Sequence, residues 1–291
     1  MIIHQHSTDF VPDYLLIGHI AHDVTPQGPQ LGGTVSYGAH TAAAFGLRVG
    51  ILTSAQSNEP LLEKLPTNTV VVNIPADHTT MFENHYEGST RTQFMYYRAR
   101  TLTPALLPPA WRQARLVHFG PIAYEVAPEF ATAFDNARIC ITPQGWMRLR
   151  EKDGRVRTVH WRDAADVLPH STVTIMSEED IRHDPDLEAA FAELAPMLIL
   201  TRAEHGGTVH QRAQSTDFTA YEVATQTDPT GAGDIFATTF HIAFARFGDL
   251  HRALRAATYI AGVSVTRAGF ASAPSASEVT QAWEHAREYA G

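Results

Sequence analysis

The sequence DPTGAGD at residues 228–234 stands directly before an apolar stretch with helical spacing that runs to Phe247. Gly231 and Gly233 let the backbone turn tightly and approach a ligand closely. The first N–H groups of the helix that follows have no partner inside it, and the helix dipole makes that end attractive to anions. The stretch therefore predicts an anion-binding turn with the carboxylate of Asp234 beside it.

A carboxylate next to a phosphate-sized anion site suits phosphoryl transfer to a hydroxyl. The carboxylate accepts the hydroxyl proton, while backbone amides stabilise the phosphoryl group in transit. From this stretch alone, a plain glycine turn with Asp234 as the helix N-cap is an equal alternative. The two lysines, Lys64 and Lys152, do not follow a glycine, so the chain has no GxxxxGK[ST] phosphate loop.

The C-terminal third contains signals for two further helices. Gly248 is expected to end the first helix, and Asp249 to cap a second one with apolar residues at helical spacing up to Ala261. Ser275 and Glu278 form a capping-box pattern before a last helix. These residues predict where the helices begin and end.

Upstream, short apolar stretches alternate with helix-like ones. A small-residue helix is expected over residues 35–45, and strands over 15–17, 49–53, 70–74, 116–119, 138–141, 173–176 and 197–201. With helical stretches between the strands, this alternation predicts an α/β fold: a central, mostly parallel sheet with helices on both faces. No linker or repeat divides the chain, so residues 1–291 are expected to form one domain.

Two stretches depart from this rhythm, residues 23–31 and 79–98. Their polar and aromatic residues alternate with a period of two, which is typical of strands with one wet face. They are expected to form a small accessory sheet, either a lid over a site or an ordinary edge hairpin. Aromatic residues at 94–97 of such a lid would permit a homodimer.

Composition limits the class of protein. With 291 residues, 44% of them hydrophobic, and a net charge of −9, the chain is expected to be globular and to bind neither nucleic acid nor an anionic membrane. Cys140 is the only cysteine, which excludes an intrachain disulfide and a cysteine-rich metal centre. Residues 1–6 lack the features of a signal peptide, and no apolar run is long enough to span a membrane, so a cytoplasmic location is expected.

These motifs together resemble the ribokinase-like (PfkB-type) carbohydrate kinase family. Residues 228–248 resemble its signature DTxGAGDxF and the helix after it, with Pro229 in place of the threonine. The other matches follow the family order along nearly the whole chain: Gly18 with Asp23, the diglycine Gly32-Gly33, the TxGxxG-like loop Thr201–Gly207, and Gly269 with Pro274. The resemblance implies a ribokinase-like fold with a small β-strand lid. It also implies ATP-dependent phosphorylation of a hydroxyl on a sugar or polyol.

The resemblance further implies roles for individual residues. Asp234 is expected to be the catalytic base, beside an anion site formed by Gly231, Ala232 and Gly233. The residues expected to bind the substrate are Asp23, Gly33, Thr34 and Tyr37. The residues expected to bind ATP are Thr201, Arg202, Glu204, Gly206, Thr230 and Gly269. Asp180 and Asp228 are the expected metal residues, for Mg²⁺, and K⁺ is expected near Asp228, Thr230 and Gly269.

Some positions depart from the family pattern. Tyr37 and Ala21 stand where asparagines are usual, so a ribose-like acceptor would lose hydrogen-bond partners worth about 1–3 kcal/mol each. Ala203 replaces a glycine of the nucleotide loop. The segments TTMFE (79–83) and QGWMR (144–148) resemble stretches of the plant-type inositol kinases. A cyclitol such as inositol, or a nucleoside, is therefore the alternative acceptor.

Two alternatives of other classes stay open. Residues 34–38 resemble part of the GxSxG turn of serine hydrolases, although Thr34 replaces its first glycine. A relative that binds a sugar or nucleotide without turning it over is the non-enzymatic alternative. The 16 histidines show no HExxH spacing, so they predict no metal centre.

Overall fold

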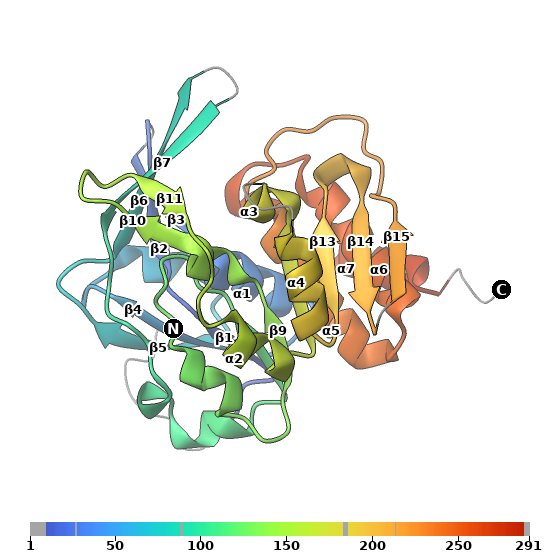
Figure 1. Cartoon of the computed structure of the whole chain (residues 1–291), viewed down its shortest axis with the longest axis horizontal. Helices are drawn as coiled ribbons and strands as arrows, with labels where there is room; N and C mark the ends of the chain where they lie inside the picture. The colour runs from blue at the N-terminus through green and yellow to red at the C-terminus, as the bar shows by residue number, and fades with distance from the viewer. Residues whose placement is uncertain (1–9, 27, 88–89, 183–185, 213, 288–291) are drawn as a thin grey trace.

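The computed structural model describes residues 10–26, 28–87, 90–182, 186–212 and 214–287, and Figure 1 shows how their elements are arranged. The N-terminal residues used above to exclude a signal peptide lie outside these ranges. A nine-stranded sheet forms the centre, in the order β15-β14-β13-β12-β9-β8-β1-β4-β5. Its strands are β1 (Tyr14–Ile17), β4 (Val49–Ala55), β5 (Thr69–Pro75), β8 (Leu116–Phe119), β9 (Arg138–Ile141), β12 (Val173–Ser177), β13 (Leu198–Thr201), β14 (Gly207–Gln211) and β15 (Gln214–Phe218).

Most of this sheet is parallel. Antiparallel pairing is found at one edge, where β14 pairs with β13 and β15. Every residue of β1 and β4 is buried, as expected for strands that are covered on both faces. The predicted α/β fold with a mostly parallel sheet is confirmed, and each expected strand is present within two residues of its expected bounds.

The helices begin and end where the capping residues predict. Gly248, at φ +63°, ends α5, and the side chain of Asp249 accepts a hydrogen bond from the Arg252 N–H at 2.8 Å. Ser275 and Glu278 form the predicted capping box. The α-helices are α1 (Thr34–Ala44), α2 (Ala164–Val167), α3 (Glu178–Ile181), α4 (Leu187–Leu194), α5 (Ala232–Phe247), α6 (Leu250–Ser264) and α7 (Ala276–His285). α5 packs against both α1 and α6.

The expectation of helical connections throughout is wrong for several loops, which contain only short 3₁₀ turns. Between β4 and β5 the chain forms η1 (Pro60–Lys64), and between β8 and β9 it forms η4 (Pro128–Thr132). Each begins with a proline, which fixes φ at the first position of a turn. A 3₁₀ helix rarely extends beyond one turn or so, since its hydrogen bonds are poor. The other 3₁₀ helices are η2 (Pro104–Leu106), η3 (Pro109–Gln113), η5 (Pro143–Met147), η6 (Leu168–His170), η7 (Ala203–His205) and η8 (Gly269–Ser272).

The two stretches expected to form an accessory sheet do so. They supply the four-stranded sheet β3-β2-β6-β7, made of β2 (Ala21–Thr25), β3 (Gly28–Gly32), β6 (Thr80–Glu87) and β7 (Thr90–Tyr97). It lies at the upper left in Figure 1, above the end of the central sheet that β4 and β5 form. A hairpin of β10 (Arg148–Arg150) and β11 (Val156–Thr158) was not expected from the sequence. It adjoins β7 through a bridge between Phe94 and Arg155.

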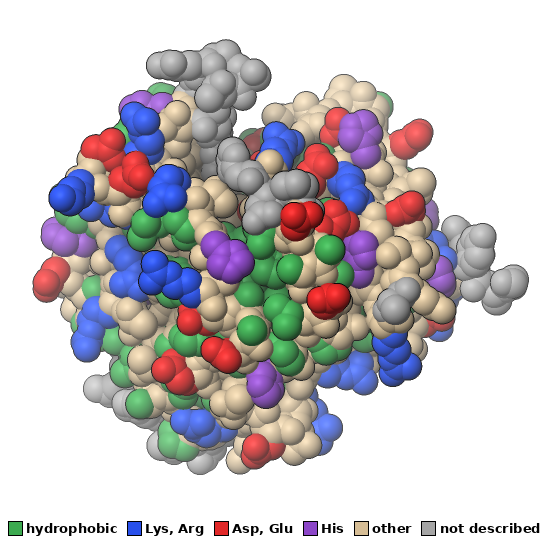
Figure 2. Space-filling view, viewed as in Figure 1, with side chains coloured by type: hydrophobic (Ala, Val, Ile, Leu, Met, Phe, Trp, Pro, Cys, Tyr) green, Lys and Arg blue, Asp and Glu red, His purple; other side chains and the backbone are tan. Residues whose placement is uncertain are grey.

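Apolar side chains fill both sides of the central sheet. One cluster contains Phe119, Phe130 and Trp146, and another contains Phe236 and Phe240 of α5. Acidic and basic side chains are interspersed over the face of the molecule shown in Figure 2. None of the helices in the described ranges is long and apolar enough to cross a membrane.

Candidate active site

The turn into α5 has the geometry that an anion site needs. Gly231 adopts φ +80°, and no side chain caps the helix. The N–H of Ala232 donates to the carbonyl of Pro229 at 3.1 Å. The next N–H groups, those of Gly233 and Asp234, have no hydrogen-bond acceptor within the described part of the chain. A Cβ added at Gly233 would meet nothing within 4 Å. The unpaired donors therefore lie at the positive end of the helix dipole, where an anion can bind them.

Asp234 follows in the first turn of α5. Burial raises the pKa of its carboxyl to about 6, although a hydrogen bond from the Thr34 side chain and the charge of Arg148 both lower the pKa. A carboxylate with a pKa near neutrality is ionised at pH 7 and still basic enough to take up a proton. Its environment therefore suits a general base.

Thr34 and Tyr37 bring the start of α1 against the start of α5. Thr34 packs on Gly120 at the end of β8, where an added Cβ would lie 2.4 Å from the Thr34 methyl group. The ring of Tyr37 lies over Gly231, so that a Cβ there would be 2.4 Å from the ring. Burial raises the pKa of the Tyr37 phenol far above its usual range, and the charges of Asp234 and other carboxylates add to this. The phenol therefore stays protonated.

Asp23 and the diglycine Gly32-Gly33 form the other side of the group that contains Thr34 and Tyr37. The carboxylate of Asp23 lies directly over Gly32, where a Cβ would be 1.9 Å from an Asp23 oxygen. Gly33 precedes α1 with φ +92°, and a Cβ there would be 2.6 Å from the carbonyl oxygen of His19. At both positions the close contacts leave no room for a side chain, so glycine is required. Asp23 is also among the charges that act on Tyr37, so the four residues expected to bind the substrate lie close to one another.

Asp228 joins two loops. One of its oxygens accepts the N–H of Thr230 at 2.9 Å, and the other accepts the N–H of Gly269 at 3.3 Å. Partial burial opposes ionisation, but these hydrogen bonds together hold the pKa of Asp228 below its usual range. The structure therefore brings Asp228, Thr230 and Gly269 together, as expected for the cation-binding residues. Each Asp228 oxygen already has one N–H partner.

Asp180 is the second expected metal residue. Its carboxylate accepts the backbone N–H of Ser177 at 3.0 Å in a capping box at the start of α3. Burial raises the pKa of Asp180, while hydrogen bonds from Ser177 and Gln144 and the charge of Arg148 lower it. Among the described residues there is no group of three or more metal-binding side chains. One carboxylate beside donor phosphates is nevertheless the usual environment of a kinase Mg²⁺, so the donor set at Asp180 fits this ion.

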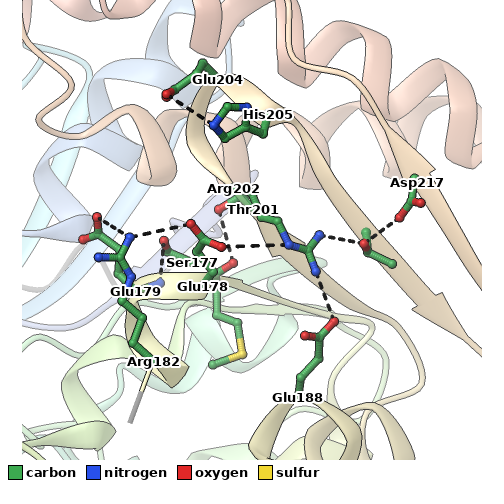
Figure 3. Close-up of polar contacts among 12 residues, drawn as sticks. Ser177, Glu178, Glu179, Arg182, Glu188, Thr201, Arg202, Glu204, His205 and Asp217 are labelled. Carbon is green, nitrogen blue, oxygen red and sulfur yellow. Dashed lines mark hydrogen bonds and ion pairs between the residues drawn. The ribbon is translucent and has the colours of Figure 1, made fainter. Parts of the chain in front are cut away.

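The loop after β13 carries four of the six residues expected to bind ATP, and Figure 3 shows three of these four, Thr201, Arg202 and Glu204. The Thr201 hydroxyl donates to the Met176 carbonyl, which ties this loop to the strand before α3. The Arg202 guanidinium donates to Thr208 at 2.6 Å and to Glu188 at 3.4 Å. A cavity of about 500 Å³ lies here, lined by Arg202, His205, Gly207, Thr208, Asp217, Phe218 and Thr219.

The tip of this loop has an unusual backbone. Ala203, in place of a glycine, has φ +47°, and Gly206 has φ +80° with no room for a Cβ beside Phe218. The side chains of Glu204 and His205 are mostly exposed, with 72% and 77% of their surface accessible, and pair with each other. Glu204 therefore faces solvent rather than the protein interior.

Sequence reasoning gave no role to Arg148. It lies 86 positions from Asp234 in the sequence, yet its charge acts on both Asp234 and Asp180. The sequence did contain a signal for this position. The QGWMR segment follows the strand predicted over residues 138–141, so it starts at the carboxyl edge of the sheet.

The hydrolase alternative does not fit the structure. Ser36 is fully buried, and its hydroxyl donates to the Gly32 carbonyl at 2.8 Å within the first turn of α1. A serine nucleophile must reach the substrate, so Ser36 does not provide one.

The comparisons with known proteins agree with this arrangement. A family model described as pfkB family carbohydrate kinase matches residues 35–276. None of the curated protein sequences matches the chain.

Solved structures with the same fold have low sequence identity to the chain. One is a pyrophosphate-dependent kinase in the ribokinase family complexed with a pyrophosphate analogue and myo-inositol, with a TM-score of 0.76, 19% identity, and coverage of 92% of this chain and 99% of that one. Another is a ribokinase from Thermotoga maritima, with a TM-score of 0.73, 16% identity, and coverage of 94% of this chain and 100% of that one. A third is an Arabidopsis thaliana ribokinase complexed with ribose and ATP, with a TM-score of 0.67, 13% identity, and coverage of 94% of this chain and 99% of that one. At these identities the three structures show the fold.

Proposed function

Because the chain belongs to the pfkB family of carbohydrate kinases, we propose that it transfers the γ-phosphoryl group of ATP to a hydroxyl of a sugar or polyol, with Asp234 as the general base. The observation that carries this proposal is the position of Asp234. Its carboxylate, with a pKa of about 6, stands next to unpaired N–H groups at the N-terminus of α5. A base and an anion site side by side are the two parts that hydroxyl phosphorylation requires.

The reaction is a single in-line transfer. The acceptor hydroxyl oxygen forms a bond to the γ-phosphorus as the bond to the leaving oxygen of ADP breaks, and the hydroxyl proton passes to Asp234. The N–H groups of Gly233 and Asp234 stabilise the oxygens of the transferring group. Tyr37, being protonated, can donate a hydrogen bond on the acceptor side.

Two cations complete the proposed site. Asp180 would hold Mg²⁺ together with the donor phosphates, and the ion would neutralise their charge. K⁺ would lie at the loops joined by Asp228, where carboxylate and carbonyl oxygens are the available ligands.

The accessory sheet is the proposed lid, and the chain as a whole the proposed kinase domain. Closure of the β-strands at 23–31 and 79–98 over the acceptor would exclude water and so limit hydrolysis of ATP. Tyr96 and Tyr97 on β7 are 41% and 44% exposed, which supports the proposal that the lid forms a homodimer.

A cyclitol is the second candidate acceptor. Two positions where relatives supply an asparagine are Tyr37 and Ala21 here, and Tyr37 is 6% exposed beside the base. The site therefore lacks the amide partners that relatives offer to a ribose-like acceptor, which is why we keep a cyclitol as the alternative. The similar structure that holds myo-inositol agrees with this choice. A nucleoside acceptor is the remaining kinase alternative.

The test is donor consumption across a panel of ribose, fructose, inositols, nucleosides and hexose phosphates. Each is incubated with Mg²⁺ and K⁺ and with either ATP or pyrophosphate, the donor named for one similar structure. One acceptor that raises product formation far above background supports the kinase and identifies its substrate. Binding of ATP without turnover on any acceptor would contradict the proposal and favour a non-catalytic relative.

A further inference from the structure

The carboxylate of Glu125 is fully buried at the carboxyl edge of the central sheet. One of its oxygens accepts the N–H of His19 at 2.9 Å, and the other accepts the N–H of Ala123 at 2.6 Å. The N–H of Ile122 is shared between the two oxygens, at 2.9 and 3.0 Å. These bonds offset the cost of burying a carboxyl group. Glu125 therefore joins the connection between β1 and β2 to the loop after β8.

The loop after β8, residues 120–125, is here named the β8 loop, and a second side chain fixes it. Tyr124 adopts φ +56°, which is uncommon for a residue with a side chain. The Arg98 guanidinium donates to the carbonyl oxygens of Ala123 and Tyr124, both at 2.7 Å. Because Arg98 follows β7 directly, these bonds attach the β8 loop to the end of the proposed lid. A strained backbone persists only where its surroundings fix it, so the β8 loop depends on Arg98 and Glu125.

His19 connects Glu125 to the residues expected to bind the substrate. The N–H of His19 donates to Glu125, and its carbonyl oxygen would lie 2.6 Å from a Cβ added at Gly33. Asp23 lies four positions further along the same segment. A shift of the His19 backbone would therefore disturb both Gly33 and Asp23.

The ring of His19 contacts two places where the chain passes between the central sheet and the lid. Nε2 donates to the carbonyl oxygen of Arg100, three residues after β7, at 2.8 Å. Since a carbonyl oxygen only accepts, Nε2 carries the proton, and Nδ1 accepts the hydroxyl of Thr80 at 2.7 Å. Burial lowers the pKa of His19, which favours this neutral ring. His19 thus ties the start of β6 and the segment after β7 to the residue that Glu125 holds.

The lid also packs on the β8 loop through apolar side chains. A buried cluster contains one residue from each of three lid strands and two from the β8 loop: Ala21, Phe82, Met95, Ile122 and Ala123. The side chain of Ile122 also comes within 3.5 Å of a Cβ added at Gly33. The β8 loop therefore contacts both the lid and the diglycine.

We propose that Glu125 is a positioning residue for the acceptor: it holds the connection between β1 and β2 against the β8 loop and so keeps Gly33 and Asp23 in place. This inference rests on the proposed function and adds to it a residue that acts through others. Among the described residues, none of the hydrogen bonds of Glu125 reaches α5, which carries Asp234 and the anion site. Loss of Glu125 is therefore expected to weaken acceptor binding and to leave donor binding unchanged.

The first test compares Glu125→Gln and Glu125→Ala with the control Asp249→Asn. A glutamine amide has one acceptor oxygen, so it can accept from His19 or from Ala123 but turns its own N–H₂ group toward the other donor. Asp249 also accepts a backbone N–H, but at the end of α5 opposite to Asp234. With the acceptor found by the panel, Glu125→Gln is expected to raise the acceptor KM at least about tenfold, and Glu125→Ala to raise it further. Asp249→Asn should leave it unchanged.

Donor binding separates positioning of the acceptor from a general loss of structure. In Glu125→Gln, kcat at saturating acceptor and the Kd of the donor should stay within about twofold of the wild type. Thermal melting shows which variants are folded under the assay conditions. An unchanged acceptor KM in folded Glu125→Gln, or an equal rise in acceptor KM and donor Kd, would overturn the inference.

A second measurement needs no turnover. Amide hydrogen exchange in Glu125→Gln should be at least about tenfold faster than in the wild type over residues 18–24 and 31–36, and unchanged over 231–240. Asp249→Asn should speed exchange only at the start of its own helix. Equal exchange at 18–24 and 31–36 would overturn the role of Glu125. If exchange changes as expected but the wild type turns over no acceptor, the proposed function fails and the link between Glu125 and these segments stands.

Discussion

Replacing Asp234 with asparagine is expected to stop catalysis and to stabilise the fold at the same time. Burial holds the pKa of this carboxyl at about 6, above the usual value of 3.8. The charged form is therefore disfavoured in the folded protein. An acid whose pKa is raised on folding destabilises the native state above that pKa, and the cost disappears as the pH falls below the usual value. Asparagine has nearly the same shape and no charge to desolvate.

The size of the stabilisation follows from the two pKa values. The difference between 3.8 and about 6 corresponds to a ceiling of about 3 kcal/mol at pH 7 to 8. The side chain is partly exposed, so solvent screens the charge, and we expect about 1–2 kcal/mol. For a chain of this size that is a rise in Tm of about 2–5 °C. Turnover is expected to fall at least ~10²-fold while ATP binding persists, because only proton transfer is lost.

The assay is thermal melting at pH 4, 6 and 8, together with steady-state kinetics at pH 8. The gain in Tm should be largest at pH 8 and absent at pH 4, where Asp234 is protonated as well. Asp77→Asn, at an exposed position, is the matched control and should change neither quantity. A variant that is less stable than the wild type at pH 8, or that keeps near-normal turnover, would refute this reasoning.

Four further changes test other parts of the site. Since a base must be ionised, kcat should fall about tenfold per pH unit below about pH 6, and a flat profile down to pH 5 would exclude Asp234 as the base. Gly233→Ala should lower turnover by placing a methyl group in the open space beside the unpaired N–H groups, yet stabilise the helix by up to about 1 kcal/mol in urea unfolding; full turnover would show that no ligand group lies there. Gly231→Ala should destabilise the protein by about 1–3 kcal/mol in the same unfolding assay, because φ is +80° and the methyl group would lie 2.4 Å from the Tyr37 ring; an unchanged midpoint would contradict that packing. Tyr37→Asn should alter acceptor KM or preference and leave the nucleotide Kd unchanged, and an effect on the nucleotide Kd alone would place the residue elsewhere.

Local signals in the sequence predicted the framework of the fold well. Gly248, Asp249 and Ser275 act on the backbone within a few residues of themselves, so the ends of the last helices are visible without tertiary structure. The strands of the central sheet that were predicted are short apolar runs, and several of them, such as β1 and β4, are buried on both faces. The glycine turn at 231–233 and its carboxylate are also contiguous, which made them recognisable.

The parts that were not predicted depend on contacts between distant segments. β10 and β11 are three residues each, too short to show a period. Their position beside β7 depends on a bridge between Phe94 and Arg155, which are far apart in the sequence. Arg148, whose charge acts on Asp234, follows η5, and the position of η5 depends on its packing against β12. Propensity and spacing carry no information on such a contact.

The contact between the ring of Tyr37 and Gly231 links acceptor binding to donor binding, two properties that a kinase would otherwise adjust separately. The side chain that we propose to line the acceptor site also packs on the backbone of the turn proposed to hold the donor's phosphate. A smaller residue at 37 would enlarge the acceptor pocket but remove support from that turn, while any residue with a Cβ at 231 requires the ring to leave. Phe270, whose ring centroid is 4.7 Å from that of Tyr37, extends the dependence to the loop that Asp228 binds. Evolution or engineering of a new acceptor preference would therefore proceed by paired substitutions at these positions, with strongly non-additive effects on donor use.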